Sequence, residues 1–216
     1  MKAILFDLDG TILDTRDLIL NSMQYAYTKV LGAELLPSDD ELLSLVGIPL
    51  REQMERISPQ NSEALFEAYL EGNSQAPDSM LRSFSGTAET LALLRESGLR
   101  LAVVTSKRHH SAAEGLESTG LLDYFEFVLG ADDTTEHKPK PGPLLDAAQI
   151  MGLATHECSY VGDSPFDMLA ARSADILAIG ALWGMFSKEA LLEAGAELFV
   201  SHISELPKLL EARQSA

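Results

Sequence analysis

Two carboxylates near the start of the chain are spaced for joint chemistry. Asp7 and Asp9 follow a short apolar run at residues 3–6, and Gly10 comes directly after them. A short apolar run closed by a turn signal predicts a buried strand of a parallel sheet. Because side chains alternate along a strand, the two carboxylates leave it on the same side and repel each other unless a cation or a proton intervenes. This spacing suggests catalysis or metal binding, and an ordinary acidic turn is the alternative.

Polar residues also follow three later strand-like runs. Each group taken alone fits a structural role, such as a helix N-cap or a rigid Lys-Pro loop. In open parallel sheets, however, ligands bind beyond the carboxyl ends of the strands, so the groups should meet at one edge. Two acids, a hydroxyl, a lysine and a further acid together indicate a phosphoryl-transfer site. The later groups are Thr105, Ser106 and Lys107; Lys138 and Pro139; and Gly162, Asp163 and Asp167.

The order of strand-like and helix-like runs predicts an α/β fold with a doubly wound, Rossmann-like parallel sheet. The predicted strands are 3–6, 101–104, 125–129, 158–161, 176–179 and 198–200. The helices predicted to alternate with strands in the later part of the chain are 87–97, 111–118, 143–151, 165–173, 188–194 and 204–211.

The long segment after the first strand reads as helices alone. These are predicted at 17–31, 38–46, 50–57 and 62–72, and a polar stretch at 73–85 reads as a linker. An insertion of this size after a strand's carboxyl end would lie over the site. We therefore expect an inserted all-helical cap at residues 15–81, on a core formed by residues 1–14 and 82–216.

Composition limits the possible partners. The 216 residues carry 33 acidic and 16 basic side chains, for a net charge of −17. Since Lys and Arg do not cluster, we expect neither a nucleic-acid nor a membrane partner. Cys158 is the only cysteine, which excludes an internal disulfide, and no apolar run approaches the roughly 18 residues of a membrane span. These features predict a cytoplasmic enzyme, and they leave monomer and homodimer open.

The four groups of residues resemble the four motifs of the haloacid dehalogenase superfamily. They occur here as Asp-Leu-Asp-Gly-Thr from Asp7, then Thr105, Lys138-Pro139, and Gly162-Asp163 with Asp167. The resemblance covers the whole chain, including a helical insertion between the first two motifs, as in that superfamily's helical-cap branch. Dehalogenases lack the second aspartate of the first motif, so Asp9 indicates a phosphatase or a mutase.

The resemblance implies roles for the acidic residues. Asp7 would attack phosphorus and form an aspartyl-phosphate, which divides a slow hydrolysis into two easier steps. Asp9 would protonate the leaving oxygen and later deprotonate the attacking water. Mg²⁺ is expected between Asp7, the backbone carbonyl of Asp9, and Asp163. Asp167, one helical turn beyond Asp163, is the candidate outer or water-mediated ligand.

The remaining candidates bind the substrate. Thr105, Ser106 and Lys138 would hold the phosphoryl oxygens, and Lys138 would also keep Asp7 ionised. Arg51 ends a kinked segment between two cap helices and could bind an anionic group, because related helical caps reach the substrate from this region. A solvated arginine at a helix start is the alternative for Arg51.

The segments 103–107 and 132–143 resemble phosphoglycolate phosphatases and the related inorganic pyrophosphatases. The sequence therefore predicts a Mg²⁺-dependent phosphatase that acts on a small phosphorylated metabolite, an anionic phosphomonoester. An inorganic pyrophosphatase and a β-phosphoglucomutase-like phosphotransferase are the enzymatic alternatives. The alternative from another class is a phosphate-responsive binding protein that keeps the fold without turnover.

Overall fold

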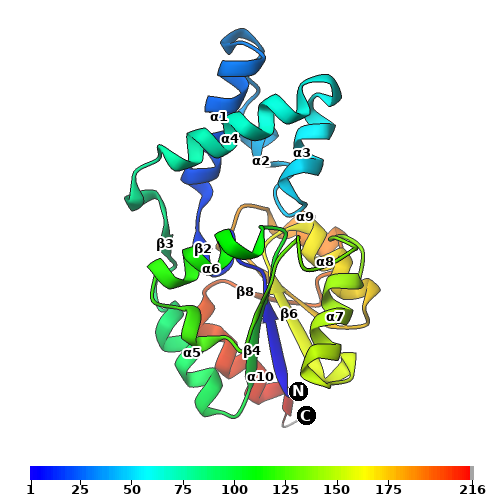
Figure 1. Ribbon diagram of the computed structural model, residues 1–216. Helices are drawn as coiled ribbons and strands as arrows, with labels where there is room; N and C mark the ends of the chain where they lie inside the picture. Colours follow the sequence, from blue (N-terminus) through cyan, green and yellow to red (C-terminus); the bar gives the residue numbers. More distant parts are fainter. Residues whose placement is uncertain (215–216) are drawn as a thin grey trace.

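A single parallel sheet forms the lower part of the molecule (Figure 1). The computed structural model describes residues 1–214. The six strands run in the order β5-β4-β1-β6-β7-β8 and every neighbouring pair is parallel. Their bounds are β1 Ala3–Phe6, β4 Arg100–Val104, β5 Val128–Leu129, β6 Cys158–Gly162, β7 Leu177–Ala181 and β8 Leu198–Val200. The chain builds outward from β1 first to one side and then to the other, so the predicted doubly wound sheet is confirmed.

Helices cover both faces of this sheet. The alternation along β1 shows the two layers, because Ile4 and Phe6 pack in one apolar core while Ala3 and Leu5 pack in another. All four side chains have no solvent exposure, as expected for a central parallel strand. The first core is covered by α5 (Thr87–Glu96), α6 (His109–Ser118) and α10 (Leu206–Gln214), and the second by α7 (Gly142–Met151), α8 (Pro165–Ser173) and α9 (Lys188–Glu193).

The strand order places the reversal of winding at the centre of the sheet. β1 pairs with β4 on one side and with β6 on the other, with Phe6 opposite Val103 and Val161. Connections leave β4 and β6 in opposite directions across the sheet, which opens a crevice beyond the carboxyl end of β1. Asp7 follows β1 and Asp163 follows β6. The fold therefore brings the first and last acidic motifs to the same crevice.

Four helices form a cap above this crevice (Figure 1). Ile19, Met23 and Ala26 recur at helical spacing along α1 and face an apolar core that also contains Leu65 and Phe66 of α4. This apolar cluster of the cap is separate from the two clusters beside the sheet. Met185 and Phe186, in the loop after β7, also pack against the cap cluster. The cap helices are α1 (Arg16–Val30), α2 (Asp39–Leu43), α3 (Leu50–Ile57) and α4 (Ser62–Ser74), all inside the predicted cap segment 15–81.

The chain crosses between core and cap through a two-stranded antiparallel ribbon. β2 (Leu13–Asp14) pairs with β3 (Arg82–Ser83), and Arg82 Nε donates to Asp14 Oδ2 at 2.8 Å. The polar stretch predicted as a linker at 73–85 contains β3. The sequence did not reveal this strand, because a strand of two residues has no detectable period and its partner lies far away in the chain.

Three other predicted boundaries are too long or misplaced. The helix predicted at 38–46 ends at Leu43, because residues 44–48 turn back through the bridge between Val46 and Ile48. The strand predicted at 125–129 contains only Val128–Leu129. The structure also has short 3-10 turns at Ala33–Leu35, Pro59–Asn61, Asp78–Met80, Leu122–Tyr124, Thr155–Glu157 and Ile203–Glu205, the last replacing the start of the helix predicted at 204–211.

None of the helices in the described chain has the length and apolar character that crossing a membrane requires.

Candidate functional site

A buried ion pair lies directly beyond the end of β1. The Asp7 backbone N–H donates to the Val161 carbonyl at 2.9 Å, which extends the β1–β6 pairing by one residue and fixes the Asp7 side chain in the crevice. Lys138 Nζ donates to Asp7 Oδ1 at 2.8 Å, to Asp167 Oδ1 at 2.5 Å and to the Tyr160 hydroxyl at 3.0 Å. An ammonium carries three hydrogens, so these three partners use all of the donors of Lys138.

Asp167 is held at the first turn of α8 by a capping box. Ser164 Oγ accepts from the Asp167 N–H, while Asp167 Oδ2 accepts from the Ser164 N–H at 3.0 Å and from its hydroxyl at 2.6 Å. Pro165 fits the first helical position, where no backbone donor is needed. This arrangement aims Asp167 Oδ1 at the ammonium of Lys138.

Tyr160 is a site residue that the sequence reasoning did not identify. Its side chain is fully buried on β6, and its hydroxyl lies 2.8 Å from the Val104 carbonyl and 3.2 Å from Asp167 Oδ1. The hydroxyl can donate to only one of them while it accepts from Lys138. The only indication in the sequence is a tyrosine hydroxyl inside a strand predicted to be buried, two residues before Gly162.

Burial and mutual repulsion raise the pKa values of the site carboxyls. Burial, reinforced by Asp167 and opposed by Lys138, raises the pKa of Asp7 from 3.8 to about 7. Burial, with the charges of Asp167 and Asp7, raises the pKa of Asp163 well above its ordinary value. Lys138 alone therefore does not compensate the negative charge of this cluster. A further cation beside Asp7 and Asp163 would favour both carboxylates.

Asp163 is enclosed by two glycines. Its Oδ1 accepts from the Thr11 hydroxyl at 3.2 Å and its Oδ2 accepts from the Met185 N–H at 2.7 Å. A Cβ on Gly10 would lie 2.3 Å from Asp163 Oδ2, and one on Gly184 would lie 2.2 Å from Asp163 Cβ. Both positions therefore require glycine. Gly10 belongs to the first motif, but Gly184 was missed, because its approach to Asp163 is visible only in three dimensions.

The acidic cluster fits a hard divalent cation. Asp7, Asp163 and Asp167 are buried and offer oxygens that all lie within 4.8 Å of one another. The Lys138 ammonium binds Oδ1 of Asp167 and the start of α8 binds its Oδ2, whereas the oxygens of Asp163 accept from a neutral hydroxyl and a backbone N–H. Asp163 and the second oxygen of Asp7 are therefore the better direct ligands. The backbone carbonyl of Asp9 accepts no hydrogen bond from the described part of the chain. Carboxylate and carbonyl oxygens are the ligands that Mg²⁺ prefers.

Asp9 is paired with a lysine that was not among the predicted site residues. Lys107 Nζ lies 3.2 Å and 3.1 Å from the two oxygens of Asp9. The turn that carries Lys107 is fixed, since its N–H donates to Thr105 Oγ1 at 3.2 Å and its carbonyl accepts from the Ala131 N–H at 2.9 Å. Lys107 belongs to the same polar group as Thr105, but no local pattern in the sequence indicates that it reaches Asp9.

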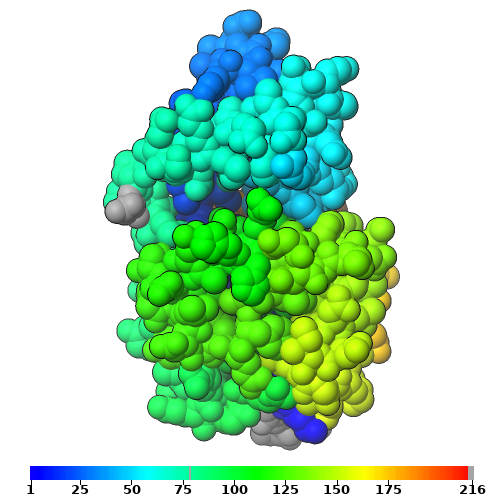
Figure 2. Space-filling model, in the orientation of Figure 1, coloured from blue at the N-terminus to red at the C-terminus, as the bar shows by residue number. Residues whose placement is uncertain are grey.

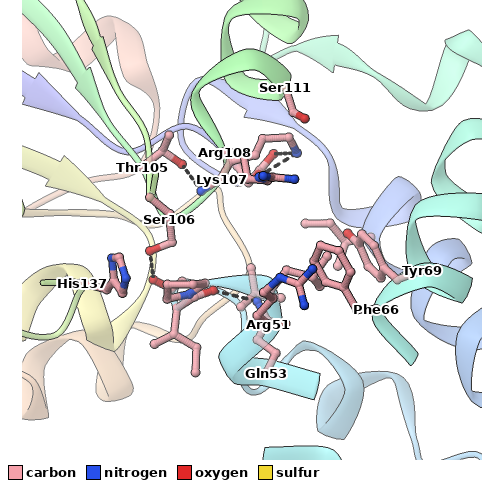
Figure 3. A pocket seen from close by; sticks show the side chains of 18 of the residues that line it. Arg51, Gln53, Phe66, Tyr69, Thr105, Ser106, Lys107, Arg108, Ser111 and His137 are labelled. Atoms are coloured by element: carbon pink, nitrogen blue, oxygen red, sulfur yellow. Dashed lines mark hydrogen bonds and ion pairs between the residues drawn. The ribbon is translucent and has the colours of Figure 1, made fainter. Parts of the chain in front are cut away.

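A cavity of about 360 Å³ lies between the cap and the core, where the surface in Figure 2 is hollowed. The catalytic candidates Asp7, Asp9 and Thr105 line its core side, whereas Lys138 and Asp163 lie behind this lining. Residues from both parts surround the opening in Figure 3. The cap contributes mainly apolar side chains, namely Ile19, Val46, Ile48, Pro49, Leu50, Phe66, Tyr69 and Leu70.

Ser106 ties the cap to the core in this structure. Its hydroxyl donates to the Gly47 carbonyl at 2.6 Å (Figure 3). Gly47 has a φ of 116°, and a Cβ there would lie 2.7 Å from Ser164 Oγ, so only glycine allows the cap loop to approach this closely. Ser106 lines the cavity, and its hydroxyl hydrogen is used by the cap loop.

Arg51 lines the same cavity from α3. Its Nη1 lies 2.5 Å from Glu63 Oε2, and its guanidinium carbon lies 3.9 Å from the centroid of the Phe66 ring. The side chain is 56% exposed. The structure thus brings Arg51 to the edge of the cavity, where Glu63 competes with any anionic ligand.

Comparison with known proteins gives a consistent set of relatives. Residues 4–181 match the family model described as haloacid dehalogenase-like hydrolase. A protein of Caldanaerobacter subterraneus, provisionally named pyrophosphatase PpaX, is 36% identical over 211 residues, which cover 98% of this chain and 95% of the relative. Pyrophosphatase PpaX of Anoxybacillus flavithermus is 30% identical over 210 residues, or 97% of each chain. The crystal structure of a predicted phosphoglycolate phosphatase from Haemophilus somnus has the same fold, with a TM-score of 0.86 at 23% identity over 97% of this chain and 98% of that one.

Proposed function

The chain belongs to the haloacid dehalogenase-like hydrolase family and is a phosphatase, and from this premise we propose that it uses Mg²⁺ to hydrolyse a small anionic phosphomonoester. One observation carries the proposal. Asp7 lines the cavity floor with one oxygen bound by Lys138, and Asp163 lies close enough to Asp7 for the two carboxylates to bind one metal ion. A nucleophile needs this combination, because its carboxylate must be ionised and must also face the substrate.

Asp7 and Asp9 would divide the reaction between them. The free oxygen of Asp7 attacks phosphorus, the bond from phosphorus to the leaving oxygen breaks, and Asp9 gives its proton to that oxygen. In the second step Asp9 takes a proton from water as the water oxygen attacks the aspartyl-phosphate. Inorganic phosphate leaves and the Asp7 carboxylate is restored.

The surrounding residues would stabilise charge during these steps. Lys138 holds Asp7 and offsets its charge, and the Thr105 hydroxyl on the cavity floor would bind a phosphoryl oxygen. Asp7, Asp163 and the Asp9 carbonyl would hold Mg²⁺, which supplies positive charge that lets an anionic phosphate approach the carboxylates. Ser106 on the core side of the cavity and Arg51 on the cap side are the further substrate-binding candidates.

Hydrolysis of inorganic pyrophosphate is the second candidate function. The names of the two relatives favour it, since both are called pyrophosphatases. A phosphomonoester and pyrophosphate present the same phosphoryl group to Asp7 and differ only in the leaving group. The residues around the leaving group therefore decide between them.

A phosphate-release panel tests the proposal. Purified protein would be assayed with 2-phosphoglycolate, pyrophosphate, sugar phosphates and nucleotides, with Mg²⁺ and with EDTA. We expect Mg²⁺-dependent release from 2-phosphoglycolate, its loss in EDTA and its recovery on adding Mg²⁺. Release in EDTA would contradict the metal assignment, and release from pyrophosphate alone would favour the second candidate. Release from no compound would favour a binding protein, and conversion of β-glucose 1-phosphate to glucose 6-phosphate would favour a mutase.

A further inference from the structure

Lys107 differs from the two other cationic side chains that line the cavity. The side chain of Lys107 is 23% exposed, whereas those of Arg51 and Arg108 are 56% and 64% exposed. Arg51 is bound by Glu63, and Arg108 lies 3.9 Å from Asp132 at the rim. A cation that is partly withdrawn from water interacts more strongly with an anion than an exposed one does. Lys107 is therefore the lining cation with the greatest influence on a bound ligand.

The ammonium of Lys107 also has donor capacity left. Among the described residues, its only partner is Asp9, whose two oxygens lie at similar distances of 3.1 Å and 3.2 Å. Lys138, in contrast, is enclosed by three partners and does not line the cavity. With three hydrogens, Lys107 can bind a second anion without leaving Asp9. Its fixed turn limits the entropy lost when it does so.

The position of Lys107 places it beside the leaving group. In the proposed reaction Asp9 lies within hydrogen-bonding distance, about 3 Å, of the leaving oxygen. Since Lys107 Nζ lies 3.1 Å from Asp9, the leaving oxygen is within roughly 6 Å of the ammonium. A group attached one or two atoms beyond that oxygen can reach Lys107. The transferred phosphoryl group lies on the other side, against Asp7.

We propose that Lys107 determines specificity for the leaving group by binding an anionic group carried one or two atoms beyond the scissile oxygen. That group is a carboxylate, as in 2-phosphoglycolate, or a second phosphoryl group, as in pyrophosphate. The inference rests on the proposed function, which puts Asp9 at the leaving oxygen. It assigns to Lys107, rather than to Arg51 at the cavity edge, the recognition of the nearest negative charge.

Calorimetric titration in the presence of Mg²⁺ tests this without turnover. The carboxylate pair of probes is 3-phosphonopropanoate and propylphosphonate, which differ in having a carboxylate or a methyl group at the same place. The phosphoryl pair is methylenediphosphonate and ethylphosphonate. Wild-type protein should bind the anionic member of at least one pair about 10-fold to 100-fold more tightly, as expected for a charge-assisted hydrogen bond. Lys107→Met should lose most of this preference, and the pair that loses more identifies the anion.

Two further variants make the result specific. Arg108→Met removes a neighbouring charge from the cavity rim and should keep the preference within about threefold, since exposed charges contribute little. Lys107→Gln repeats the neutralisation with a polar side chain, in case Lys107→Met unfolds. The inference would be overturned if a folded Lys107 variant kept the preference, or if it bound both members of a pair equally less tightly. It would also be overturned if the wild type showed no preference, or if Arg51→Met lost the preference instead. Failure of the proposed function would appear separately, as no phosphate release from any ester.

Discussion

The Lys138 ammonium lies 2.8 Å from the Asp7 carboxylate, although 131 positions separate the two residues in the chain. Both side chains are almost fully buried. The same ammonium lies 2.5 Å from Asp167. One lysine thus binds two buried carboxylates and offsets part of their charge, so this contact should matter for folding as well as for catalysis.

Replacing Lys138 should therefore destabilise the protein strongly. Lys138→Met leaves Asp7 and Asp167 buried without a counter-charge, which costs about 3–5 kcal/mol for a broken buried pair. Urea unfolding at neutral pH in EDTA would measure the loss. The matched control is Lys140→Met in the same loop, since Lys140 is exposed and lies 3.8 Å from Glu136. That variant should change the free energy of unfolding by less than about 1 kcal/mol. An equal decrease in the free energy of unfolding of both variants would contradict a stabilising role for Lys138.

The raised pKa of Asp7 predicts how stability changes with pH when the metal is chelated. Burial raises this pKa from 3.8 to about 7, so between these values the folded state holds a proton that the unfolded state has released. The contribution of Asp7 to the free energy of unfolding is therefore full below pH 3.8 and is lost as the pH rises toward 7.

Urea unfolding in EDTA across this pH range would test the sign. Stability of the wild type should fall with rising pH relative to Asp7→Asn, in which position 7 no longer titrates. A wild type that gains stability relative to the variant as the pH rises would contradict the raised pKa. Repeating the series with Mg²⁺ should reduce the difference, because a cation at Asp7 favours the ionised form.

Gly184 should be intolerant of a side chain. A Cβ there would lie 2.2 Å from Asp163 Cβ, so Gly184→Ala must displace either the carboxylate or the loop after β7. We expect at least about a tenfold weaker response to Mg²⁺ in both thermal stabilisation and phosphate release, as for loss of a residue that orients a metal ligand. Gly98→Ala is the control, because its φ of 82° strains alanine but its surroundings are open. That variant should lose stability and keep its Mg²⁺ dependence.

The positions of Asp7, Thr105 and Asp163 could be predicted because each depends on local information. A buried strand is recognisable from a few apolar residues, and parallel strands bring their carboxyl ends to one edge of a sheet. The helical cap was predictable from the long segment without strand-like runs. How closely the cap approaches the core could not be predicted, because the hydrogen bond from Ser106 to Gly47 joins two loops whose distance depends on packing.

The partners of the predicted residues could not be predicted. Lys107 reaches Asp9 and Tyr160 reaches Lys138 only once the sheet order is known. Nothing in the sequence around Tyr160 distinguishes a tyrosine that packs from one whose hydroxyl completes an ion-pair network. Likewise, the requirement for glycine at position 184 comes from the side chain of Asp163, which follows a different strand.

If the Asp7 carboxylate forms a covalent bond to phosphorus, chemical trapping should detect the aspartyl-phosphate directly. Protein turning over 2-phosphoglycolate with Mg²⁺ would be quenched and treated with borohydride, which reduces an aspartyl-phosphate to homoserine, and its tryptic peptide 3–16 would be sequenced by mass spectrometry. We expect homoserine at position 7, unmodified aspartate at position 9, and no reduction without substrate. Turnover with aspartate intact at position 7, or homoserine at position 9 instead, would contradict this role for Asp7.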